Sequence, residues 1–401
     1  MSLSENLKNL AMPGKSVGSD IRALNTPENW QPRLELSEDG GYVISQARPV
    51  DGNKDLNRIL VEEFNLDPEL WIVTGVRQSR WQKYDGEWLE AFRLSLIPAQ
   101  AARESKEDIE KLAAGIAKWK PSKKVKKTDG NLAFVFAPSD QQLGKKANGE
   151  GTEHTVDRIL NATEGAVQRL EDLRKIGRRV GTVVIALLGD HVEGNVSQGG
   201  RLQSHSASDL GLTEQARVGR RLLLAQVKAF APLADKIVVA AVNGNHDEVS
   251  RQVALDPSEG WNTAIASEVQ DICAENEALS HVEFRYPSKD HQTLAVKVCD
   301  TMLGLFHGHQ TGKDVLRYLS EQAAGQTPLG GCDVWLSGHY HNFKSMDIGD
   351  RLWVQCPTVD PGSAWYRDRR GLESNPGILT MVIGEGHSPR VDLSVIPANR
   401  T

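Results

Sequence analysis

The pattern of apolar and polar positions divides the chain at about residue 130. Beyond it lie four near-continuous apolar runs: LAFVFA at 132–137, VVIALL at 183–188, KIVVAAV at 236–242 and MLGLF at 302–306. Runs with so little alternation are typical of strands covered on both faces. Amphipathic stretches such as Glu214–Phe230 separate them. Strands alternating with helices predict an α/β fold for this part of the chain.

The pattern before residue 130 predicts a small α+β domain at 30–100. The stretch 33–45 holds two β-like runs around Asp39-Gly40-Gly41, which favours a hairpin turn. Residues 55–64 have helical spacing, and two later strand-like runs turn at Asp85-Gly86. Residues 1–29 mix Ser, Asn, Gly and Pro without a sustained period, which predicts a flexible arm.

A helical pattern from Glu104 to Trp119 runs into a lysine-rich stretch that predicts a domain boundary. Lys118–Lys127 holds six lysines and no acidic residue. Such a run is more often a solvated linker than a nucleic-acid-binding strip. We therefore assign 101–130 to a helix and basic linker, and 131–401 to one large domain.

Composition narrows the class of protein. The chain has 401 residues, of which 39% are hydrophobic and 25% charged, values that are ordinary for a soluble protein. No apolar stretch reaches the roughly 18 residues that a membrane helix needs, and the first residues lack the pattern of a secretory signal. The four cysteines form no CxxC pair, which favours reduced thiols. We expect a cytoplasmic protein with no membrane partner.

Metal-capable side chains follow each of these runs and a fifth, shorter run, VWLS at 334–337. They are, in chain order, Asp140; Asp190 and Glu193; Asn245, His246 and Asp247; His307 and His309; and His339 and His341. Ligands of α/β sheets bind beyond the carboxyl ends of the strands, so these clusters are expected to converge. Such side chains suit two divalent cations bridged by one carboxylate. With His191, which lies between Asp190 and Glu193, six of the 11 histidines lie in these clusters, which favours a shared metal site.

In order, these segments resemble those of the calcineurin-like metallophosphoesterase family. The family pattern runs DxH, GDxxE or GDxxD, GNHD or GNHE, H, and GHxH. The counterparts here are Asp140-Gln141-Gln142, Gly189–Glu193, Gly244–Asp247, His307 and Gly338–His341, within about residues 131–360. The resemblance implies a four-layer αββα sandwich of two mixed sheets flanked by helices, and hydrolysis of phosphate esters.

The resemblance also implies a role for each matching residue. The first cation would be held by Asp140, Asp190 and His341, and the second by Asp190, Asn245, His307 and His339. His246 would protonate the leaving oxygen, oriented by Glu193. A water activated by the two cations would be the nucleophile, so no protein nucleophile is needed.

One position departs from the family pattern, because Gln142 stands where the motif has histidine. As a metal ligand through its carbonyl oxygen, Gln142 would make the first site harder and favour Mn²⁺ or Mg²⁺ over Zn²⁺. The alternative is a weak or empty first site. We predict two divalent cations, with Mn²⁺ first and Mg²⁺, Fe²⁺ or Zn²⁺ as alternatives.

Several residues near the motifs allow a second interpretation. His309 is either the metal ligand in place of His307, a group that contacts the ligand, or a solvated turn residue. His191 and His205 suit the rim of the site, although either would compensate for Gln142. Asp247 suits a structural role.

The predicted function is phosphodiesterase or nuclease activity on nucleic acid or nucleotides, as in an SbcD-like branch of the family. The appended domain, the long loop Gly194–Leu212 and the basic-aromatic stretch Trp365–Gly371 favour a DNA or RNA substrate, whereas the net charge of −6 leaves the partner open. The alternatives are a non-catalytic nucleic-acid-binding protein with a degenerate first metal site, and a phosphomonoesterase. The oligomeric state is left open.

Overall fold

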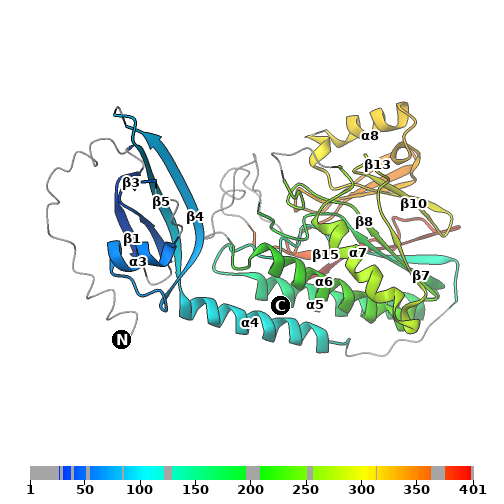
Figure 1. Ribbon diagram of the computed structural model, residues 1–401. Coiled ribbons are helices and arrows are strands. Elements are labelled where there is room, and N and C mark those ends of the chain that lie inside the picture. The colour runs from blue at the N-terminus through cyan, green and yellow to red at the C-terminus, as the bar shows by residue number, and fades with distance from the viewer. Residues whose placement is uncertain are drawn as a thin grey trace. The chain divides into compact units, whose positions relative to one another are not determined.

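The computed structural model describes residues 27, 30–37, 40–50, 55–83, 85–121, 129–195, 208–250, 256–312, 314–362 and 375–398. The chain forms two compact units, Met1–Lys111 and Leu112–Thr401 (Figure 1). Outside the described residues lie most of the predicted arm 1–29, the lysines at 123–127, His205 with most of its loop, and the basic-aromatic stretch 365–371.

The first unit is built on an antiparallel sheet. Its elements are β1 (Arg33–Ser37), β2 (Gly40–Ile44), β3 (Arg48–Pro49), α3 (Leu56–Phe64), β4 (Trp71–Gln82) and β5 (Trp88–Pro98). The central strand β5 pairs with β2 and β3 and also with β4, while β1 pairs with β2. The side chain of Asp55 accepts backbone N–H groups at the start of α3, and Asn65 ends the helix in the left-handed conformation.

One face of this sheet carries the core of the unit. Buried side chains of α3, including Ile59 and Leu60, pack against Val43, Phe92 and Leu94 of the strands. Because strand side chains alternate between faces, the neighbours of these residues project from the opposite face. Helix α4 (Ala99–Lys118) follows β5.

In the described residues of the second unit there are two sheets and four α-helices after α4. The helices are α5 (Thr152–Lys175), α6 (Leu212–Phe230), α7 (Trp261–Ala274) and α8 (Val315–Ala324). The six-stranded sheet has the order β16 (Ser394–Pro397), β15 (Gly377–Gly384), β6 (Leu132–Ala137), β7 (Val180–Leu187), β8 (Lys236–Ala241) and β9 (Val282–Arg285). The five-stranded sheet has the order β10 (Leu294–Val298), β11 (Thr301–Leu305), β12 (Val334–Ser337), β14 (Arg351–Gln355) and β13 (Lys344–Ile348).

The cores of this unit lie on both faces of the sheets. Phe134 and Phe136 of β6 face the cluster that includes α5, α6 and α7. Ala133 and Val135 face the cluster shared with the five-stranded sheet. This alternation explains why LAFVFA is apolar throughout: both faces of β6 are buried. A further cluster joins α8 to the five-stranded sheet through residues such as Trp335.

The predicted α/β character is confirmed as a mixed architecture of sheets and helices. Strands β6, β7 and β8 run parallel, and so do β11 and β12. The loops after these five strands carry the predicted metal ligands. Among the described helices, none combines the length and apolarity needed to cross a bilayer.

Candidate metal centre

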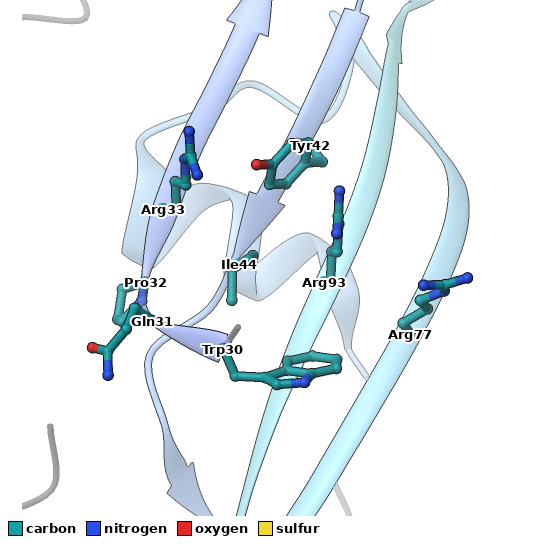
Figure 2. A pocket seen from close by; sticks show the side chains of 8 residues that line it. All are labelled: Trp30, Gln31, Pro32, Arg33, Tyr42, Ile44, Arg77 and Arg93. Atoms are coloured by element: carbon teal, nitrogen blue, oxygen red, sulfur yellow. The ribbon is translucent and has the colours of Figure 1, made fainter. Parts of the chain in front are cut away.

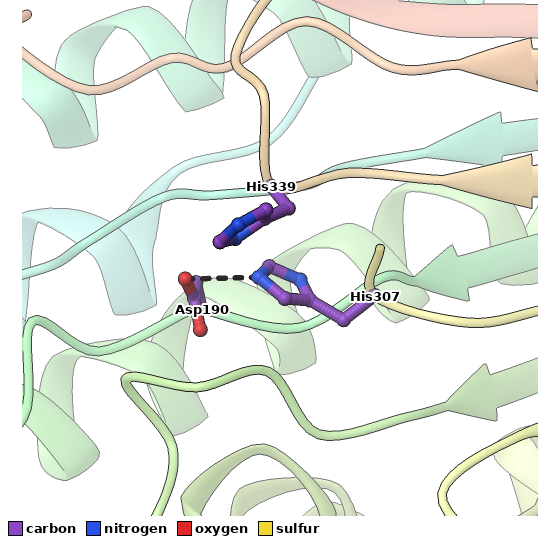
Figure 3. A group of neighbouring side chains, drawn as sticks. All are labelled: Asp190, His307 and His339. Atoms are coloured by element: carbon purple, nitrogen blue, oxygen red, sulfur yellow. Dashed lines mark ion pairs between the residues drawn. The ribbon is translucent and has the colours of Figure 1, made fainter. Parts of the chain in front are cut away.

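Three of the predicted ligands form a compact group. Asp190, His307 and His339 each offer a ligand atom, and these atoms lie within 4.8 Å of one another. The three residues follow β7, β11 and β12, and Figure 3 shows their side chains converging. Asp190 and His307 are fully buried, and His339 is partly buried.

His307 is held in one orientation by the main chain. Its Nδ1 lies 2.7 Å from the carbonyl oxygen of Leu188, which can only accept, so Nδ1 carries a proton. Its Nε2 lies 3.0 Å from Asp190 Oδ2. Burial alone would lower the pKa of His307, but the Asp190 carboxylate raises it to about 9. Either a proton or a cation is therefore required between Nε2 and the carboxylate.

His339 is suited to bind a cation as a neutral ring. Burial and the neighbouring His307 lower the pKa of His339 to about 4. Its backbone N–H donates to Asp140 Oδ2 at 2.9 Å, which ties the loop after β12 to the loop after β6. A neutral imidazole is the form that ligates metals.

Five predicted ligands have a left-handed backbone. Their φ angles are 49° for Asp140, 43° for Gln142, 55° for Asp190, 71° for His339 and 60° for His341. Each such residue costs on the order of 1–3 kcal/mol, and these conformations cluster at functional sites. The strain lies in the loops after β6, β7 and β12, where the ligand side chains converge.

Gly244 is required by the close approach of two of these loops. A Cβ at Gly244 would overlap the Asp190 carboxylate. Asp247 locks the same contact, because its Oδ2 accepts the backbone N–H groups of Asp190 at 2.7 Å and Gly244 at 2.8 Å. Burial and the Asp190 charge raise the pKa of Asp247 to about 7. Asn245, predicted as a ligand of the second cation, is buried in this loop.

His246 lies beside the group in a defined orientation. Its Nδ1 lies 2.9 Å from the main-chain oxygen of Glu193 and 3.5 Å from the Glu193 carboxylate. Its backbone N–H donates to Asp190 Oδ1 at 2.7 Å. Burial would lower the pKa of His246, but Asp190 and Glu193 raise it above its ordinary value. Glu193 therefore contacts His246, and its main-chain oxygen forms the closer contact.

The predicted first-cation residues have a different environment. His341 Nε2 lies 3.3 Å from Asp140 Oδ1, and its Nδ1 lies 3.4 Å from Asp360 Oδ2. Burial would lower the pKa of His341, but Asp360 and Asp140 raise it to about 10. Asp360, which follows β14, was not predicted from the sequence. The signal available for it was an acid after a further apolar run, LWVQC at 352–356.

A lysine contacts Gln142, the residue that stands where the family pattern has histidine. Lys145 Nζ forms an ion pair with Asp360 and donates to Gln142 Oε1 at 2.6 Å. Its side chain is only 14% exposed. The Gln142 oxygen therefore accepts a hydrogen bond from an ammonium group. An oxygen that is already engaged in this way is poorly suited to bind a metal cation. The residues fit one divalent cation at Asp190, His307 and His339, the Asp190 group. A second cation at Asp140 stays a prediction.

Two further histidines differ in their relation to the group. The His309 ring centroid lies 5.5 Å from that of His307 and 6.2 Å from that of His339. His191 is buried, and neither of its ring nitrogens has a hydrogen-bond partner among the described residues. Burial lowers the pKa of His191 to about 4. A buried imidazole without a partner is costly, so His191 is suited to contact a bound ion or substrate oxygen.

No family model and no curated protein sequence matches the chain. Solved structures match it at low similarity. A Vps29 mutant from Entamoeba histolytica has 15% identity and a TM-score of 0.29, over 63% of this chain and 87% of that one. A novel archaeal phosphodiesterase has 15% identity and a TM-score of 0.31, over 66% of this chain and 99% of that one. A predicted phosphoesterase from Streptococcus pneumoniae TIGR4 has 13% identity and a TM-score of 0.25, over 63% of this chain and 84% of that one.

Similarity of this extent carries no argument about activity. The functional conclusion therefore depends on the geometry of the site.

Proposed function

We propose that the chain hydrolyses phosphate esters with a divalent cation bound at Asp190, His307 and His339. The observation that carries the proposal is the His307 ring, whose Nδ1 proton is held by Leu188 while its Nε2 faces Asp190 at 3.0 Å. A metal-binding histidine almost always has its second nitrogen fixed in this way. The packing of helices, two sheets and α8 supports the four-layer sandwich implied by the calcineurin-like resemblance.

A divalent cation at this position would neutralise charge that develops on a phosphoryl oxygen. Mn²⁺ is the cation we propose, because the group offers carboxylate and imidazole ligands together. The Asn245 amide lies in the loop after β8, which approaches Asp190 closely at Gly244. Zn²⁺, Fe²⁺ and Mg²⁺ are the alternatives.

His246 is the proposed proton donor to the leaving oxygen. Its Nδ1–H is engaged by the Glu193 main-chain oxygen, so the second ring nitrogen, Nε2, would carry the transferred proton. Asp190 and Glu193 raise the pKa of His246 despite its burial, which favours the protonated ring that a proton donor needs. Asp190 accepts the backbone N–H of His246, which fixes the ring relative to the cation position.

Lys145 is the proposed source of positive charge on the Asp140 side. Its ammonium is held between the Asp360 carboxylate and the Gln142 amide, close to the place where the family pattern would have a histidine ligand. A fixed ammonium can neutralise charge on a phosphoryl group without a second metal. The same arrangement favours a second candidate function, binding of a phosphate ester without turnover.

The substrate class that we propose is a phosphodiester of nucleic acid or nucleotides. The separate N-terminal unit supports this choice, since a small monoester needs no second domain to bind it. A phosphomonoesterase is the rival, and the branch near SbcD remains part of the proposal.

The test is hydrolysis of bis-p-nitrophenyl phosphate and p-nitrophenyl phosphate by the full chain, with Mn²⁺ or with EDTA. We expect Mn²⁺-dependent turnover that is faster for the diester. His307→Gln should reduce turnover at least about 100-fold, and the exposed His291→Gln serves as the matched control. A folded protein that binds Mn²⁺ without turning over either ester would overturn hydrolysis in favour of binding. Faster monoester turnover would overturn the substrate class.

A further inference from the structure

The sheet of the N-terminal unit has three arginines in a row on the face opposite α3. The strand registers place Arg33 opposite Ile44, Ile44 opposite Arg93, and Arg93 opposite Arg77. These four residues therefore form one line over β1, β2, β5 and β4. Neighbouring strands lie about 4.8 Å apart, so the line is roughly 14 Å long.

The row is on the face that the core of the unit does not use. Helix α3 packs against the face that carries Val43 and Leu94, the residues next to Ile44 and Arg93. Side chains alternate along a strand, so Ile44 and Arg93 project from the other face. Figure 2 shows the arginines and Tyr42 on successive strands around one cavity.

The charges of this row are only partly balanced. Arg33 pairs with Glu35 at 3.0 Å, and both side chains are more than half exposed. The Arg93 guanidinium lies 3.9 Å from the centre of the Tyr42 ring. Within the described part of the chain, Arg77 forms no ion pair. Like charges directly opposite on a sheet destabilise it, so the pair Arg77 and Arg93 has a cost that an anionic ligand would remove.

The cavity beside the row adds aromatic surface. It has a volume of about 610 Å³, and its lining includes Trp30, Tyr42 and the three arginines. Trp30 is partly exposed. Guanidinium groups in a line with an accessible aromatic ring are the combination that binds single strands, because phosphates pair with arginine and a free base stacks on the ring.

We propose that this face binds single-stranded nucleic acid, with Arg33, Arg77 and Arg93 contacting phosphates and Trp30 stacking on a base. A single strand fits better than a duplex, because paired bases offer no free face for Trp30. The proposal goes beyond the hydrolase function and stands without it, since none of these residues belongs to the Asp190 group.

The test is fluorescence anisotropy of a labelled 20-nucleotide oligo-dT with the full chain, in EDTA so that the strand is not cleaved. We expect Arg77→Gln/Arg93→Gln to weaken binding at least tenfold. Each phosphate contact on a single strand contributes about 0.7 to the slope of log K against log salt, so the slope should fall by about 1.4. Trp30→Ala should weaken binding and leave the slope unchanged.

Arg58→Gln is the matched control. Arg58 is an exposed arginine of α3, on the side of the sheet away from the row, and it pairs with Glu62 at 2.8 Å. The Arg58→Gln substitution removes one positive charge from the same unit, and the affinity for oligo-dT should not change. Thermal melting of the variants checks their folding; Arg77→Gln alone, which removes only an exposed side chain, provides a second measure.

Three results would overturn the proposal: wild-type affinity and slope in the arginine variants, equal weakening by Arg58→Gln, or binding of poly-glutamate or duplex DNA as tight as that of the single strand. Bis-p-nitrophenyl phosphate hydrolysis should be unchanged in the row variants. Loss of strand binding with retained hydrolysis, or the reverse, therefore separates this proposal from the hydrolase function.

Discussion

At the scale of single residues, the site depends on which ring nitrogen of each histidine has a hydrogen-bond partner. His307 and His246 both direct Nδ1 to a main-chain oxygen, of Leu188 and Glu193 respectively. These contacts fix the tautomers, so Nε2 is the nitrogen available for a cation in one ring and for a proton in the other. The two histidines have similar environments and different proposed roles because only Nε2 of His307 lies against Asp190.

Removing the proposed proton donor should separate catalysis from metal binding. His246→Ala is expected to lower kcat by about 100- to 10,000-fold, the usual contribution of general acid catalysis, while the bound Mn²⁺ is unchanged. Diester hydrolysis and metal analysis of the purified protein measure the two quantities. His291→Ala, at an exposed position, is the control. Retained turnover would remove His246 from this role.

Cation binding should release a proton from His307. Its pKa is raised to about 9 without a cation, so at pH 7 Nε2 carries a proton that a metal must displace. Mn²⁺ affinity should therefore rise about tenfold per pH unit between pH 6 and 8 and level off above 9. Calorimetry in buffers of different ionisation enthalpy counts the protons. An affinity that does not change with pH would contradict the assignment of His307.

Lys145 should limit the number of cations. If its ammonium supplies the charge beside Gln142, the wild-type chain binds one Mn²⁺ tightly, and Gln142→His/Lys145→Met, which restores a ligand and removes the ammonium, binds a second. Metal titration followed by electron paramagnetic resonance distinguishes one ion from a coupled pair. Two tight equivalents in the wild type would instead support the two-cation prediction and leave Lys145 without this role.

At the scale of elements, the parallel strands bring the site together and the loops after them give it shape. The loops after β6, β7 and β12 hold Asp140, Asp190 and His339 in left-handed conformations. Hydrogen bonds between loops hold these conformations, such as the His339 N–H to Asp140 and the Asp190 N–H to Asp247. The strands supply rigid ends, so the strain is confined to a few residues that the surrounding packing holds in place.

The contact between two of these loops should tolerate no side chain at Gly244. Gly244→Ala would drive a Cβ into the Asp190 carboxylate, so Mn²⁺ affinity should fall at least tenfold and turnover with it. Gly115→Ala is the control, because no atom lies within 4 Å of its added Cβ and alanine favours the helix α4. That variant should be more stable by about 0.5–1 kcal/mol. Metal titration and thermal melting test both; a functional Gly244→Ala would contradict the packing.

At the scale of the whole molecule, the two units have separate cores. Among the described residues, the N-terminal core is one cluster between α3 and its sheet, whereas the large unit buries clusters on both faces of its sheets. Buried apolar area is the main source of stability, so the larger core should give the more stable unit. The proposed cation site belongs to the large unit, and the arginine row to the small one.

Calorimetry should therefore resolve two transitions, of which only one responds to metal. At a concentration of 100 times its Kd, Mn²⁺ should stabilise the large unit by about 2.7 kcal/mol and raise its melting temperature. The transition of the small unit should stay in place. Oligo-dT should raise the melting temperature of the small unit and leave the transition of the large unit in place. A single transition that moves with either ligand would show that the units unfold together.

The sequence by itself determined which metal-capable side chains follow the strands, and it predicted the order of these strands. Period-two and continuous apolar patterns are local, so they predicted the strands β6, β7, β8 and β11, and the acids, amide and imidazoles that follow them. We predicted that these side chains converge because parallel strands end at the same edge of a sheet. Asp190 follows a strand of the six-stranded sheet, whereas His307 and His339 follow strands of the five-stranded sheet, so the packing of the two sheets is also needed. Asp190, His307 and His339 do lie together.

Only the tertiary structure decided which atoms meet. Lys145 and Asp360 are 215 positions apart, and no periodicity connects them. The His307 tautomer depends on a carbonyl oxygen 119 positions away, and the arginine row depends on the registers of three strand pairs. A one-residue slip in any register would move an arginine to the other face. Long-range packing sets such contacts, and a pattern of neighbouring residues does not contain that information.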